Sequence, residues 1–400
     1  MKKFLLIVVV AVVITLAFFA TQVKASTPDV AAPIAVVMCF ETGDILYERN
    51  MNQRWIPASM TKIMTAFITY QEIEAGSISL NTEIRVSANA ATFSQNRRIE
   101  GSFVPLQQGA YITVDTLLQL LMLPSGNAAA VVLAEHISGT EAAFVERMNE
   151  TAYELGMYSS FTNSHGAIAH HSNAYSIAVL IRAFIQQYPD ILRITSMPSM
   201  RFGGTTYNNT NRLLSTHYFR DADGFKTGTI RASGWGHSTT AERDGRRVIA
   251  VLMNTANNDA RQNQSRTLLQ FGFDELARRD AAAAARVRVF HAGRVIPLDN
   301  PAVVSGGQLF LPIGDILRPL GFRLSWDGTY RVVTATDSDG GHITLFIDRP
   351  VAFVRGTPVT LRISARMVDN RVYVPLQFIE AVTETTATWD NATGVVQFNN

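Results

Sequence analysis

The C-terminal part of the chain repeats itself with an offset of 63 residues, and this duplication limits what that part can fold into. Matching residues in the two copies are Phe290 and Phe353, Gly293 and Gly356, Leu298 and Leu361, Pro312 and Pro375, Ile316 and Ile379, Trp326-Asp327 and Trp389-Asp390, and Val332-Val333 and Val395-Val396. A unit of about 60 residues buries too little apolar surface to be stable alone, so each copy needs its neighbour to complete a core. The repetition predicts a duplicated α+β domain over residues 286–400, with repeats at about 286–348 and 349–400.

Residues 26–280 show a different pattern, with strands at both ends and helices between them. The expected strands are Ile34–Phe40, Ile45–Tyr47, Phe225–Thr229, Trp235–Ala241 and Arg247–Met253. The expected helices are Ser59–Ala75, Val114–Leu123, Ala128–Ile137 and Glu141–Leu155. Gly76, Gly139 and Gly156 stand where helix C-terminal caps belong. This order predicts a mixed α/β (α+β) domain, an antiparallel sheet flanked by helices, and the alanine-rich stretch 278–285 is expected to be a helix tail or a linker.

The first 25 residues have the composition of a signal peptide. Lys2 and Lys3 precede an apolar run from Phe4 to Ala20, and Val23-Lys24-Ala25 offers small residues to a signal peptidase. We expect cleavage after Ala25. The alternative is an uncleaved anchor, because 17 apolar residues are at the short limit for spanning a bilayer. Either way, the rest of the chain is expected outside the cytoplasm.

Charge and cysteine content exclude several classes of function. The formal net charge is +2, but the first 25 residues hold three lysines and no acid, so the remainder carries −1 and has no general attraction for nucleic acid. Cys39 is the single cysteine, which excludes an intramolecular disulfide and any Cys-ligated metal site. Since it lies in an apolar run, we expect a buried, inert thiol.

Lysine usage is the most informative compositional feature. The chain has 30 arginines but five lysines, and only Lys62 and Lys226 lie beyond residue 25. A buried lysine can give up its proton, whereas an arginine cannot, so these two positions indicate a need for an amine. The alternative is compositional drift that left two lysines by accident.

Both lysines lie inside patterns that can carry chemistry. In Ser59-Met60-Thr61-Lys62, a spacing of three residues at a helix start places the hydroxyl and the amine on one face. The alternative is a helix cap followed by a surface lysine. Lys226-Thr227-Gly228 lies on an expected strand, where the lysine offers a positive charge and the glycine would let a substrate backbone approach.

A third pattern, Ser125-Gly126-Asn127, lies between two expected helices, directly after Pro124. Polar side chains at such a break can line a substrate site, although an ordinary loop with an Asn cap is the alternative. Each pattern alone is weak. In this order, with both lysines inside them, the three together are a strong signal.

The set S-x-x-K, S-x-N and K-T-G resembles that of active-site serine β-lactamases and penicillin-binding proteins. The stretches PASMTKIMTA, LMLPSGNAAAVVLAEHISGT, FVERMNETAYELGM, FTNSHG, NTNRLL, DGFKTGT and RRVIAVLMN are similar to the serine D-alanyl-D-alanine carboxypeptidases among the low-molecular-mass penicillin-binding proteins. The resemblance runs from about Ala35 to Phe273. It implies the β-lactamase/transpeptidase-like fold, peptidoglycan stem peptides as substrates and β-lactams as covalent inhibitors, without a metal or other cofactor.

The resemblance also implies roles for residues. Catalytic roles fall to Ser59 as nucleophile, Lys62 as its base and Ser125 as a proton relay. Substrate-binding roles fall to Asn127, Lys226, Thr227, Gly228, Thr229 and Arg261, of which Arg261 has an equally good alternative as a solvated helix residue. A histidine group, His165, His170 and His171, has no nearby carboxylate or thiol in the sequence, so metal binding there is not expected.

Three alternatives to a carboxypeptidase stay open. A class A β-lactamase would need a deacylating glutamate in an E-x-x-L-N loop, but residues 158–227 contain no Glu. A peptidoglycan endopeptidase or transpeptidase would share the same motifs. An inactive wall-binding protein would have no need of three complete motifs.

The duplicated part is similar to the copper amine oxidase N-terminal-like domain of bacterial surface proteins, through its Val-Pro-Leu and Trp-Asp signatures. His291 and His342 are its only histidines and it has no Cys, which is too few ligands for copper. We expect a stalk or a module that contacts the cell wall or another surface partner.

Overall fold

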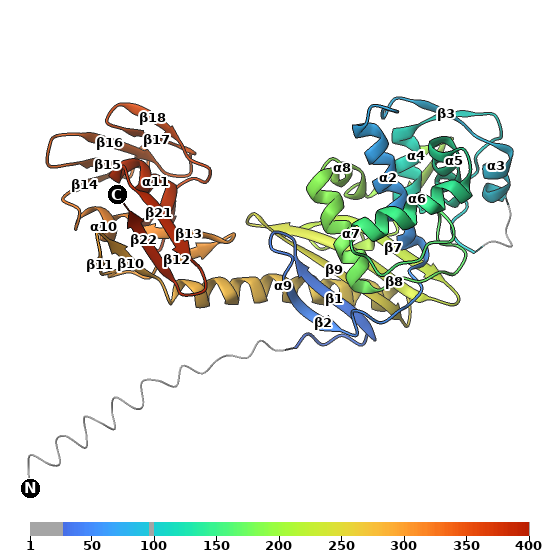
Figure 1. Ribbon diagram of the computed structural model, residues 1–400, viewed down its shortest axis with the longest axis horizontal. Helices are drawn as coiled ribbons and strands as arrows, with labels where there is room; N and C mark the ends of the chain where they lie inside the picture. Colours follow the sequence, from blue (N-terminus) through green and yellow to red (C-terminus); the bar gives the residue numbers. More distant parts are fainter. Residues whose placement is uncertain (1–26, 96–99, 400) are drawn as a thin grey trace, which may run out of the picture.

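The computed structural model describes residues 27–95 and 100–399 (Figure 1). Its first part is built on an antiparallel sheet in the order β2-β1-β9-β8-β7. These strands are β1 (Ile34–Cys39), β2 (Ile45–Arg49), β7 (Ala222–Ile230), β8 (Gly234–Arg243) and β9 (Arg246–Thr255). The predicted antiparallel sheet is therefore confirmed. The signal segment predicted over residues 1–25 lies outside the described residues.

Strand β1 is apolar on both faces because both faces of the sheet are covered. Ile34, Val36 and Met38 belong to the larger core, which most of the helices share. The residues between them, with Cys39, belong to a second core under helix α9. Cys39 is fully buried, as predicted.

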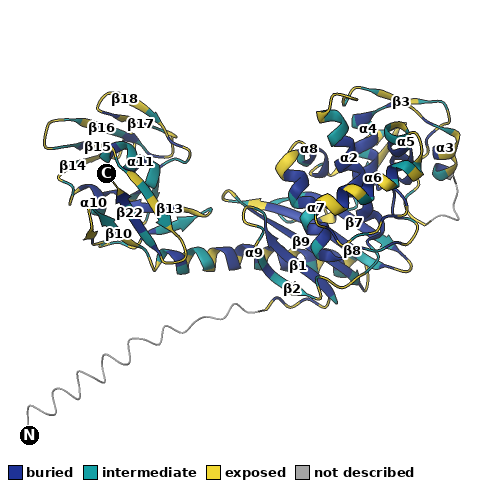
Figure 2. Cartoon of the chain, viewed as in Figure 1, coloured by how far each residue is buried: buried dark blue, intermediate teal, exposed yellow. Residues whose placement is uncertain are grey.

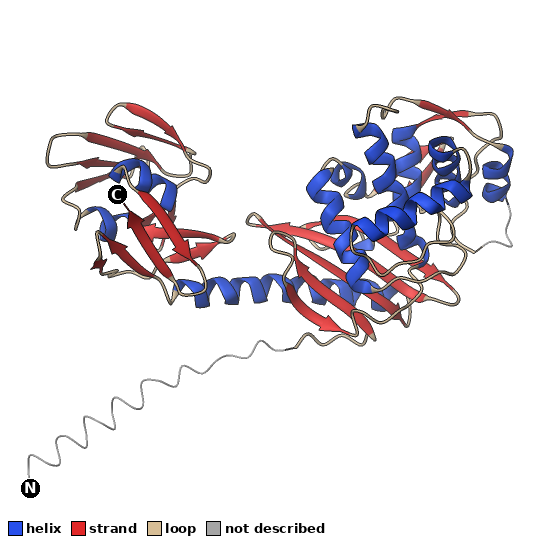
Figure 3. Cartoon of the chain, in the orientation of Figure 1, coloured by secondary structure: helices blue, strands red, loops and turns tan. Residues whose placement is uncertain are grey.

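Most of the helices cover one face of this sheet, as Figures 1 and 3 show. They are the 3-10 turn η1 (Ala58–Thr61) and helices α2 (Lys62–Glu74), α3 (Ala88–Gln95), α4 (Val114–Met122), α5 (Asn127–Ser138), α6 (Glu141–Glu154), α7 (Ala174–Gln187) and α8 (Ile191–Thr195). The other face is covered by α9 (Asn258–Ala284). Smaller elements are the hairpins β3 (Glu83–Arg85) with β4 (Tyr111–Thr113) and β5 (Ser199–Phe202) with β6 (Thr205–Asn208), and the turn η2 (Arg212–Leu214). The first half of α2 and of α5 is fully buried (Figure 2).

Local chemistry sets where these helices begin and end. The side chains of Thr113, Thr140, Asn173 and Asn257 accept hydrogen bonds from the first turns of α4, α6, α7 and α9. The three predicted cap glycines all have positive φ values. One start differs from the prediction, because the helix expected from Ser59 begins as a 3-10 turn and becomes α-helical only at Lys62.

The C-terminal part repeats its elements with the same 63-residue offset as its sequence. Matching pairs are β10 (Arg288–His291) and β17 (Val351–Val354), β11 (Arg294–Ile296) and β18 (Thr357–Thr360), β12 (Val303–Ser305) and β19 (Arg366–Val368), β13 (Gln308–Pro312) and β20 (Arg371–Pro375), α10 (Ile313–Leu317) and α11 (Leu376–Thr383), β14 (Arg323–Asp327) and β21 (Thr386–Asp390), and β15 (Val332–Thr336) and β22 (Val395–Asn399). Strand β16 (His342–Phe346) joins the two copies.

The two repeats are interleaved rather than stacked side by side. β10 of the first repeat pairs with β22 of the second, and β13 pairs with β20. In the third sheet, β16 lies between β15 and β17. The repeats therefore share one hydrophobic core, which explains physically why neither unit is expected to fold alone. The exact domain boundaries stay predictions.

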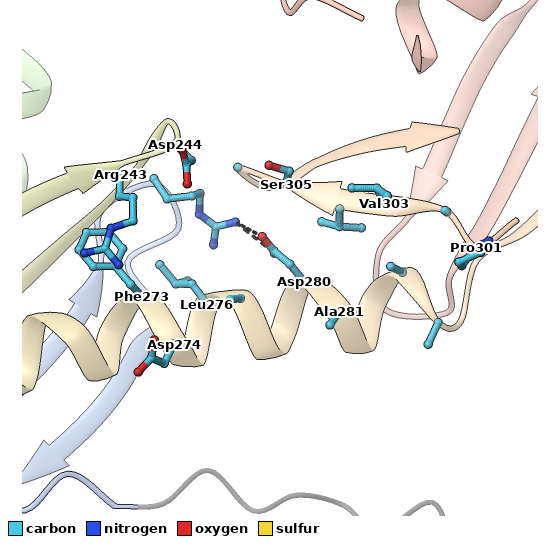
Figure 4. A pocket seen from close by; sticks show the side chains of 17 residues that line it. Arg243, Asp244, Phe273, Asp274, Leu276, Asp280, Ala281, Pro301, Val303 and Ser305 are labelled. Carbon is cyan, nitrogen blue, oxygen red and sulfur yellow. Dashed lines mark hydrogen bonds and ion pairs between the residues drawn. The ribbon is translucent and has the colours of Figure 1, made fainter. Parts of the chain in front are cut away.

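Helix α9 connects the two parts, and the alanine-rich stretch forms its last turns. Beside it lies a cleft of about 560 Å³, lined by α9, the β8–β9 hairpin and β12 (Figure 4). Arg246 donates to Asp280 across this cleft at 3.2 Å. The turn at Gly306 approaches the hairpin so closely that a Cβ there would lie 3.2 Å from the carbonyl oxygen of Asp244.

Within residues 27–95 and 100–399, no single helix is both long and apolar enough to cross a membrane. The pair α5 and α6 reaches that length and composition together, but the two helices are bent by 86°.

Candidate active site

Ser59 and Lys62 are in direct contact at the point where η1 becomes α2. The Lys62 amine Nζ donates to Ser59 Oγ at 3.1 Å. Ser59 is 6% exposed and Lys62 is completely buried. The predicted contact between hydroxyl and amine is therefore present, and the alternative of a surface lysine is wrong.

Uncharged acceptors take the other hydrogen bonds of Lys62. Its Nζ donates to Asn127 Oδ1 at 2.8 Å and to the backbone carbonyl of His165 at 2.5 Å. Together with Ser59 Oγ, these acceptors hold the amine in a fixed position, and none of the three is a carboxylate. An amine without a paired carboxylate is easier to deprotonate.

The segment Ser125–Asn127 lies at the break between α4 and α5. Ser125 has a left-handed backbone, with φ of 68°, and its Oγ is buried without a hydrogen-bond partner among the described residues. Non-glycine residues adopt this conformation rarely, and such positions cluster at active sites. Gly126 occupies the N-cap position of α5, so the alternative of an Asn cap is wrong. The side chain of Asn127 instead joins Lys62 to the backbone carbonyl of Glu100, to which its Nδ2 donates at 3.1 Å.

The predicted Lys226-Thr227-Gly228 segment lies on β7, the edge strand that packs against η1. Lys226 is 1% exposed, and its Nζ donates to the carbonyl of Thr227 at 3.3 Å. The hydroxyl of Thr227 donates to Thr210 Oγ1 at 2.7 Å. The backbone of this edge strand thus runs beside the turn that holds Ser59.

Gly228 is required by this packing. A Cβ at Gly228 would lie 2.3 Å from the carbonyl oxygen of Pro57 and 3.2 Å from the backbone nitrogen of Met60. The sequence interpretation assigned the glycine to the approach of a substrate backbone, but the close approach in the structure is made by the chain's own backbone. The glycine therefore sets the distance between β7 and Ser59.

Arg261 lies on α9 but reaches the same strand from the opposite face of the sheet. Its guanidinium donates to Thr229 Oγ1 at 2.8 Å and lies 4.9 Å from the ring centroid of Trp235. Only 5% of Arg261 is exposed, so the alternative of a solvated helix residue is wrong. The contact places a positive charge at the end of the Lys226–Thr229 segment.

Burial lowers the proton affinity of both lysines. Burial first, and the positive charge of Lys226 second, hold the pKa of Lys62 well below its usual range. Burial and the nearby Arg261 lower the pKa of Lys226 to about 7. The same burial lowers the pKa of Arg261 to about 10. The site thus combines an amine that loses its proton easily with an excess of positive charge.

Several residues that shape the site had no signal of their own in the sequence. The carbonyl of His165 binds Lys62, Thr210 binds Thr227, and Trp235 packs against the guanidinium of Arg261. His237 pairs with Thr227 in the neighbouring strand and donates to or accepts from Ser265 Oγ at 2.9 Å. These partners come from segments far apart in the sequence, so no local motif contains them.

The histidine group has a structural role in the described residues. His170 Nε2 lies 2.8 Å from Thr61 Oγ1, which ties the loop to η1. Gly166 lies against the same turn, because a Cβ there would be 2.0 Å from the carbonyl oxygen of Ala58. Burial lowers the pKa of His165 to about 3 and that of His170 to about 4, so both are neutral near pH 7. Within residues 27–95 and 100–399, no group of His, Cys, Asp and Glu is arranged to hold a metal ion.

Comparison with known families and structures agrees with this geometry. Residues 21–257, more than half of the chain, match the family model described as D-alanyl-D-alanine carboxypeptidase. Residues 290–398 match the copper amine oxidase N-terminal domain. The D-alanyl-D-alanine carboxypeptidase DacF of Bacillus subtilis is 33% identical over 267 residues, which cover 64% of this chain and 66% of that protein.

Solved structures give the same result. Penicillin-binding protein 5 from Haemophilus influenzae is 30% identical, with a TM-score of 0.59 over 63% of this chain and 73% of that one. Penicillin-binding protein D2 from Listeria monocytogenes in its cefotaxime-bound form is 27% identical, with a TM-score of 0.56 over 62% of this chain and 99% of that one. This chain covers about two thirds of the length of the Bacillus subtilis relative, and it covers a similar share of the D-alanyl-D-alanine carboxypeptidase DacD of Salmonella typhimurium.

Proposed function

Because this chain belongs to the D-alanyl-D-alanine carboxypeptidase family, we propose that it removes the terminal D-alanine from peptidoglycan stem pentapeptides through an acyl-enzyme on Ser59. It is a serine-type peptidase and a penicillin-binding protein. The observation that carries the proposal is the buried contact of 3.1 Å between Lys62 Nζ and Ser59 Oγ. This contact unites a nucleophile with a base whose pKa is lowered by burial and by Lys226.

Acylation begins when neutral Lys62 takes the hydroxyl proton of Ser59. The Ser59 oxygen attacks the carbonyl carbon of the penultimate D-alanine, and the carbonyl oxygen becomes negative in the tetrahedral intermediate. The backbone amides of Ser59 and Thr229 stabilise that oxygen as an oxyanion hole, since β7 runs beside η1. Keeping an amine neutral near pH 7 requires a pKa shift of about three units, or about 4 kcal/mol.

Collapse of the intermediate breaks the peptide bond and releases D-alanine. The leaving nitrogen takes the proton that Lys62 carries, with Ser125 Oγ as the relay. Asn127 fits a positioning role, because its side chain fixes the Lys62 amine at 2.8 Å and is itself tied to the loop at Glu100. Water then hydrolyses the ester of Ser59 and frees the tetrapeptide.

Selectivity for a chain end follows from the positive charge on β7. The free carboxylate of the terminal D-alanine binds Lys226 and the hydroxyl of Thr227, and Gly228 brings their strand close to Ser59. Arg261 supports this segment through Thr229 Oγ1. A substrate without a free carboxylate forfeits these interactions, which favours removal of a terminal residue over internal cleavage.

β-Lactams acylate the same serine, which fits the cefotaxime-bound form of the Listeria monocytogenes relative. Their ring carbonyl takes the place of the peptide carbonyl, and their carboxylate takes the place of the D-alanine carboxylate. Among the described residues the hydrogen bonds of Lys62 go to uncharged acceptors, and residues 158–227 contain no Glu that could activate a water against the ester as in class A β-lactamases. We expect the penicilloyl ester to be long-lived.

The location of the enzyme follows from its substrate. Peptidoglycan lies outside the cytoplasmic membrane, and the first 25 residues have the composition of a signal peptide. We therefore place the protein outside the cytoplasm, secreted or attached to the cell envelope.

The direct test is release of free D-alanine from a soluble stem pentapeptide, with Ser59→Ala as the control. The proposal predicts one D-alanine per pentapeptide and a tetrapeptide product, both absent with Ser59→Ala. If the protein cleaved cross-linked peptide dimers but left the pentapeptide intact, it would be an endopeptidase. If it hydrolysed penicillin rapidly, it would be a β-lactamase. Either result would overturn the proposal.

A further inference from the structure

The duplicated domain contains two grooves that occupy equivalent places in the two repeats. The first has a volume of about 330 Å³. Its lining includes Pro312, Ile313, Gly314, Trp326, Arg371 and Val372. The second has a volume of about 380 Å³, and its lining includes Pro375, Leu376, Gln377, Trp389, Gln308 and Leu309. Each residue of one set lies 63 positions from its counterpart in the other, so the grooves are related by the internal duplication. Both volumes fall in the range of ligand sites, about 300–1,000 Å³.

Each groove is built from both repeats. The first combines Trp326 on β14 with Arg371 on β20, and the second combines Trp389 on β21 with Gln308 on β13. The interleaving of β13 and β20 in one sheet brings these walls together. Neither repeat alone contains a complete groove.

Most residues that are identical in the two repeats have a structural reason to be so. Pro312 and Pro375 stand at the N-caps of α10 and α11. Asp327 and Asp390 accept backbone hydrogen bonds in the turns that follow them. Such positions maintain the fold and say nothing about a ligand.

Packing accounts for only one member of the tryptophan pair, because Trp389 packs against the shared core and Trp326 does not belong to it. Trp326 is 44% exposed, although it is large and apolar. Trp389 is partly buried, and its Nε1 is shielded without a hydrogen-bond partner among the described residues. Both line the grooves, whereas the other retained aromatic pair, Phe290 and Phe353, lines neither. A large aromatic kept in both repeats at a groove wall indicates a ligand contact.

The lining chemistry indicates a neutral, polar ligand with flat apolar faces. The charged residues that line the first groove are Asp315, Arg318 and Arg371, and those that line the second are Glu380 and Arg362. The near balance of charge gives little attraction for a polyanion. Amide, guanidinium and carboxylate groups beside an indole can bind a sugar ring, whose faces carry C–H groups and whose edge carries hydroxyls.

We propose that the two grooves bind the glycan strand of peptidoglycan, one saccharide segment in each. The choice of polymer rests on the proposed function, because the stem peptide substrate is carried on that strand. Two equivalent sites suit a ligand that presents the same unit repeatedly, and a glycan strand does so. Joint occupancy of both sites raises avidity by about 100-fold or more over one site.

The test is binding of the full-length protein to glycan strands from which the stem peptides have been removed, measured by co-sedimentation. A soluble β-1,4-linked N-acetylglucosamine hexamer serves as a second probe, by titration calorimetry. We expect Trp326→Ala and Trp389→Ala each to weaken strand binding about tenfold, and the double variant to weaken it about 100-fold. The matched control is Phe353→Ala, an exposed aromatic outside both grooves, which is expected to bind normally.

Trp389 also packs on the core, so a second pair of variants guards against misfolding. Gln308→Ala and Arg371→Ala change exposed residues at equivalent positions of the two grooves and are expected to weaken binding without loss of thermal stability.

Unchanged binding by the double tryptophan variant, and by Gln308→Ala and Arg371→Ala, would overturn the proposal. So would binding of free stem peptide, but not of stripped glycan, at the grooves. All these variants are expected to release D-alanine from soluble pentapeptide at the normal rate, so failure of the grooves and failure of the catalytic proposal give different results.

Discussion

At the scale of single residues, the site depends on a lysine that is kept neutral. Beyond residue 25 every basic side chain except Lys62 and Lys226 is an arginine or a histidine. Both lysines are buried, and the positive charge of Lys226 helps to lower the pKa of Lys62. The sequence alone led to both lysines, because their motifs are local. It did not lead to the carbonyl of His165, which fixes Lys62 from 103 positions away.

Replacing Lys62 tests its role as the base. We expect Lys62→Arg to slow acylation by benzylpenicillin by about 10³-fold, because arginine keeps its proton and cannot accept that of Ser59. The rate constant of acylation, measured by stopped flow, gives the comparison. Wild-type rates in Lys62→Arg would contradict the role, provided that circular dichroism shows the variant folded.

The pH dependence of kcat/KM tests both lysines. Lys62 must be neutral, so activity falls as the pH drops below its lowered pKa. Lys226 must be charged to bind the substrate carboxylate, and its pKa of about 7 means that kcat/KM falls as the pH rises above about 7. We expect Lys226→Arg to lose this alkaline limb, since arginine stays protonated. An unchanged alkaline limb in that variant would assign it to another group.

At the scale of elements, the position of η1 against β7 decides the geometry of the site. The five strands of the central sheet, the four expected helices and the cap glycines were predictable, because hydrophobic runs and capping residues are local signals. Helices α3, α7 and α8 and the two small hairpins were not among the expected elements. The approach of β7 to η1 was not, since it depends on where two distant segments pack. For that reason the sequence did not show that Gly228 packs against the backbone of η1. It also could not decide whether Arg261 belongs to the site or is a solvated helix residue.

Gly228→Ala tests this packing. A methyl group 2.3 Å from the carbonyl oxygen of Pro57 must displace η1, so we expect penicillin acylation to drop by at least about 100-fold and unfolding to become easier by about 2 kcal/mol. Gly76→Ala is the control, because no atom lies within 4 Å of its Cβ position and only its positive φ carries a cost. Equal effects of both substitutions would show that the close approach is unimportant.

The loop that holds Lys62 and η1 is expected to be sensitive to acid. His170 is buried with a pKa of about 4, while an unfolded histidine titrates near 6.5. Below pH 6.5 His170 takes up a proton in the unfolded chain but stays neutral in the folded chain. The free energy of unfolding therefore falls by about 3 kcal/mol between pH 6.5 and 4. Urea unfolding at several pH values measures this, and His170→Gln is expected to flatten the slope.

At the scale of the whole molecule, two parts that match different family models are joined by one long helix. The internal repeat was visible in the sequence, but the pairing of strands from one copy with strands from the other was not. A constant offset shows which residues are equivalent in the two copies, but it does not show which strands pair with each other. The cleft beside α9 likewise arises only when both domains are present.

Arg246 and Asp280 link the β8–β9 hairpin to α9 beside this cleft. We expect Asp280→Asn to leave the rate of acylation unchanged but to lower stability by about 1 kcal/mol, because the partly buried guanidinium of Arg246 loses one of its two carboxylate partners and keeps the other, Glu41. Differential scanning calorimetry, with Asp274→Asn on the same helix as control, measures the difference. Equal thermograms for the two variants would argue against a structural role of this pair.

The central claim is that Ser59 becomes acylated. The most direct measurement is the intact mass of the protein after mixing with benzylpenicillin, followed over time beside Ser59→Ala. Our account predicts a long-lived adduct of one penicillin per chain that is absent from Ser59→Ala. An unmodified wild-type protein with intact drug, or an adduct that persists in Ser59→Ala, would contradict it.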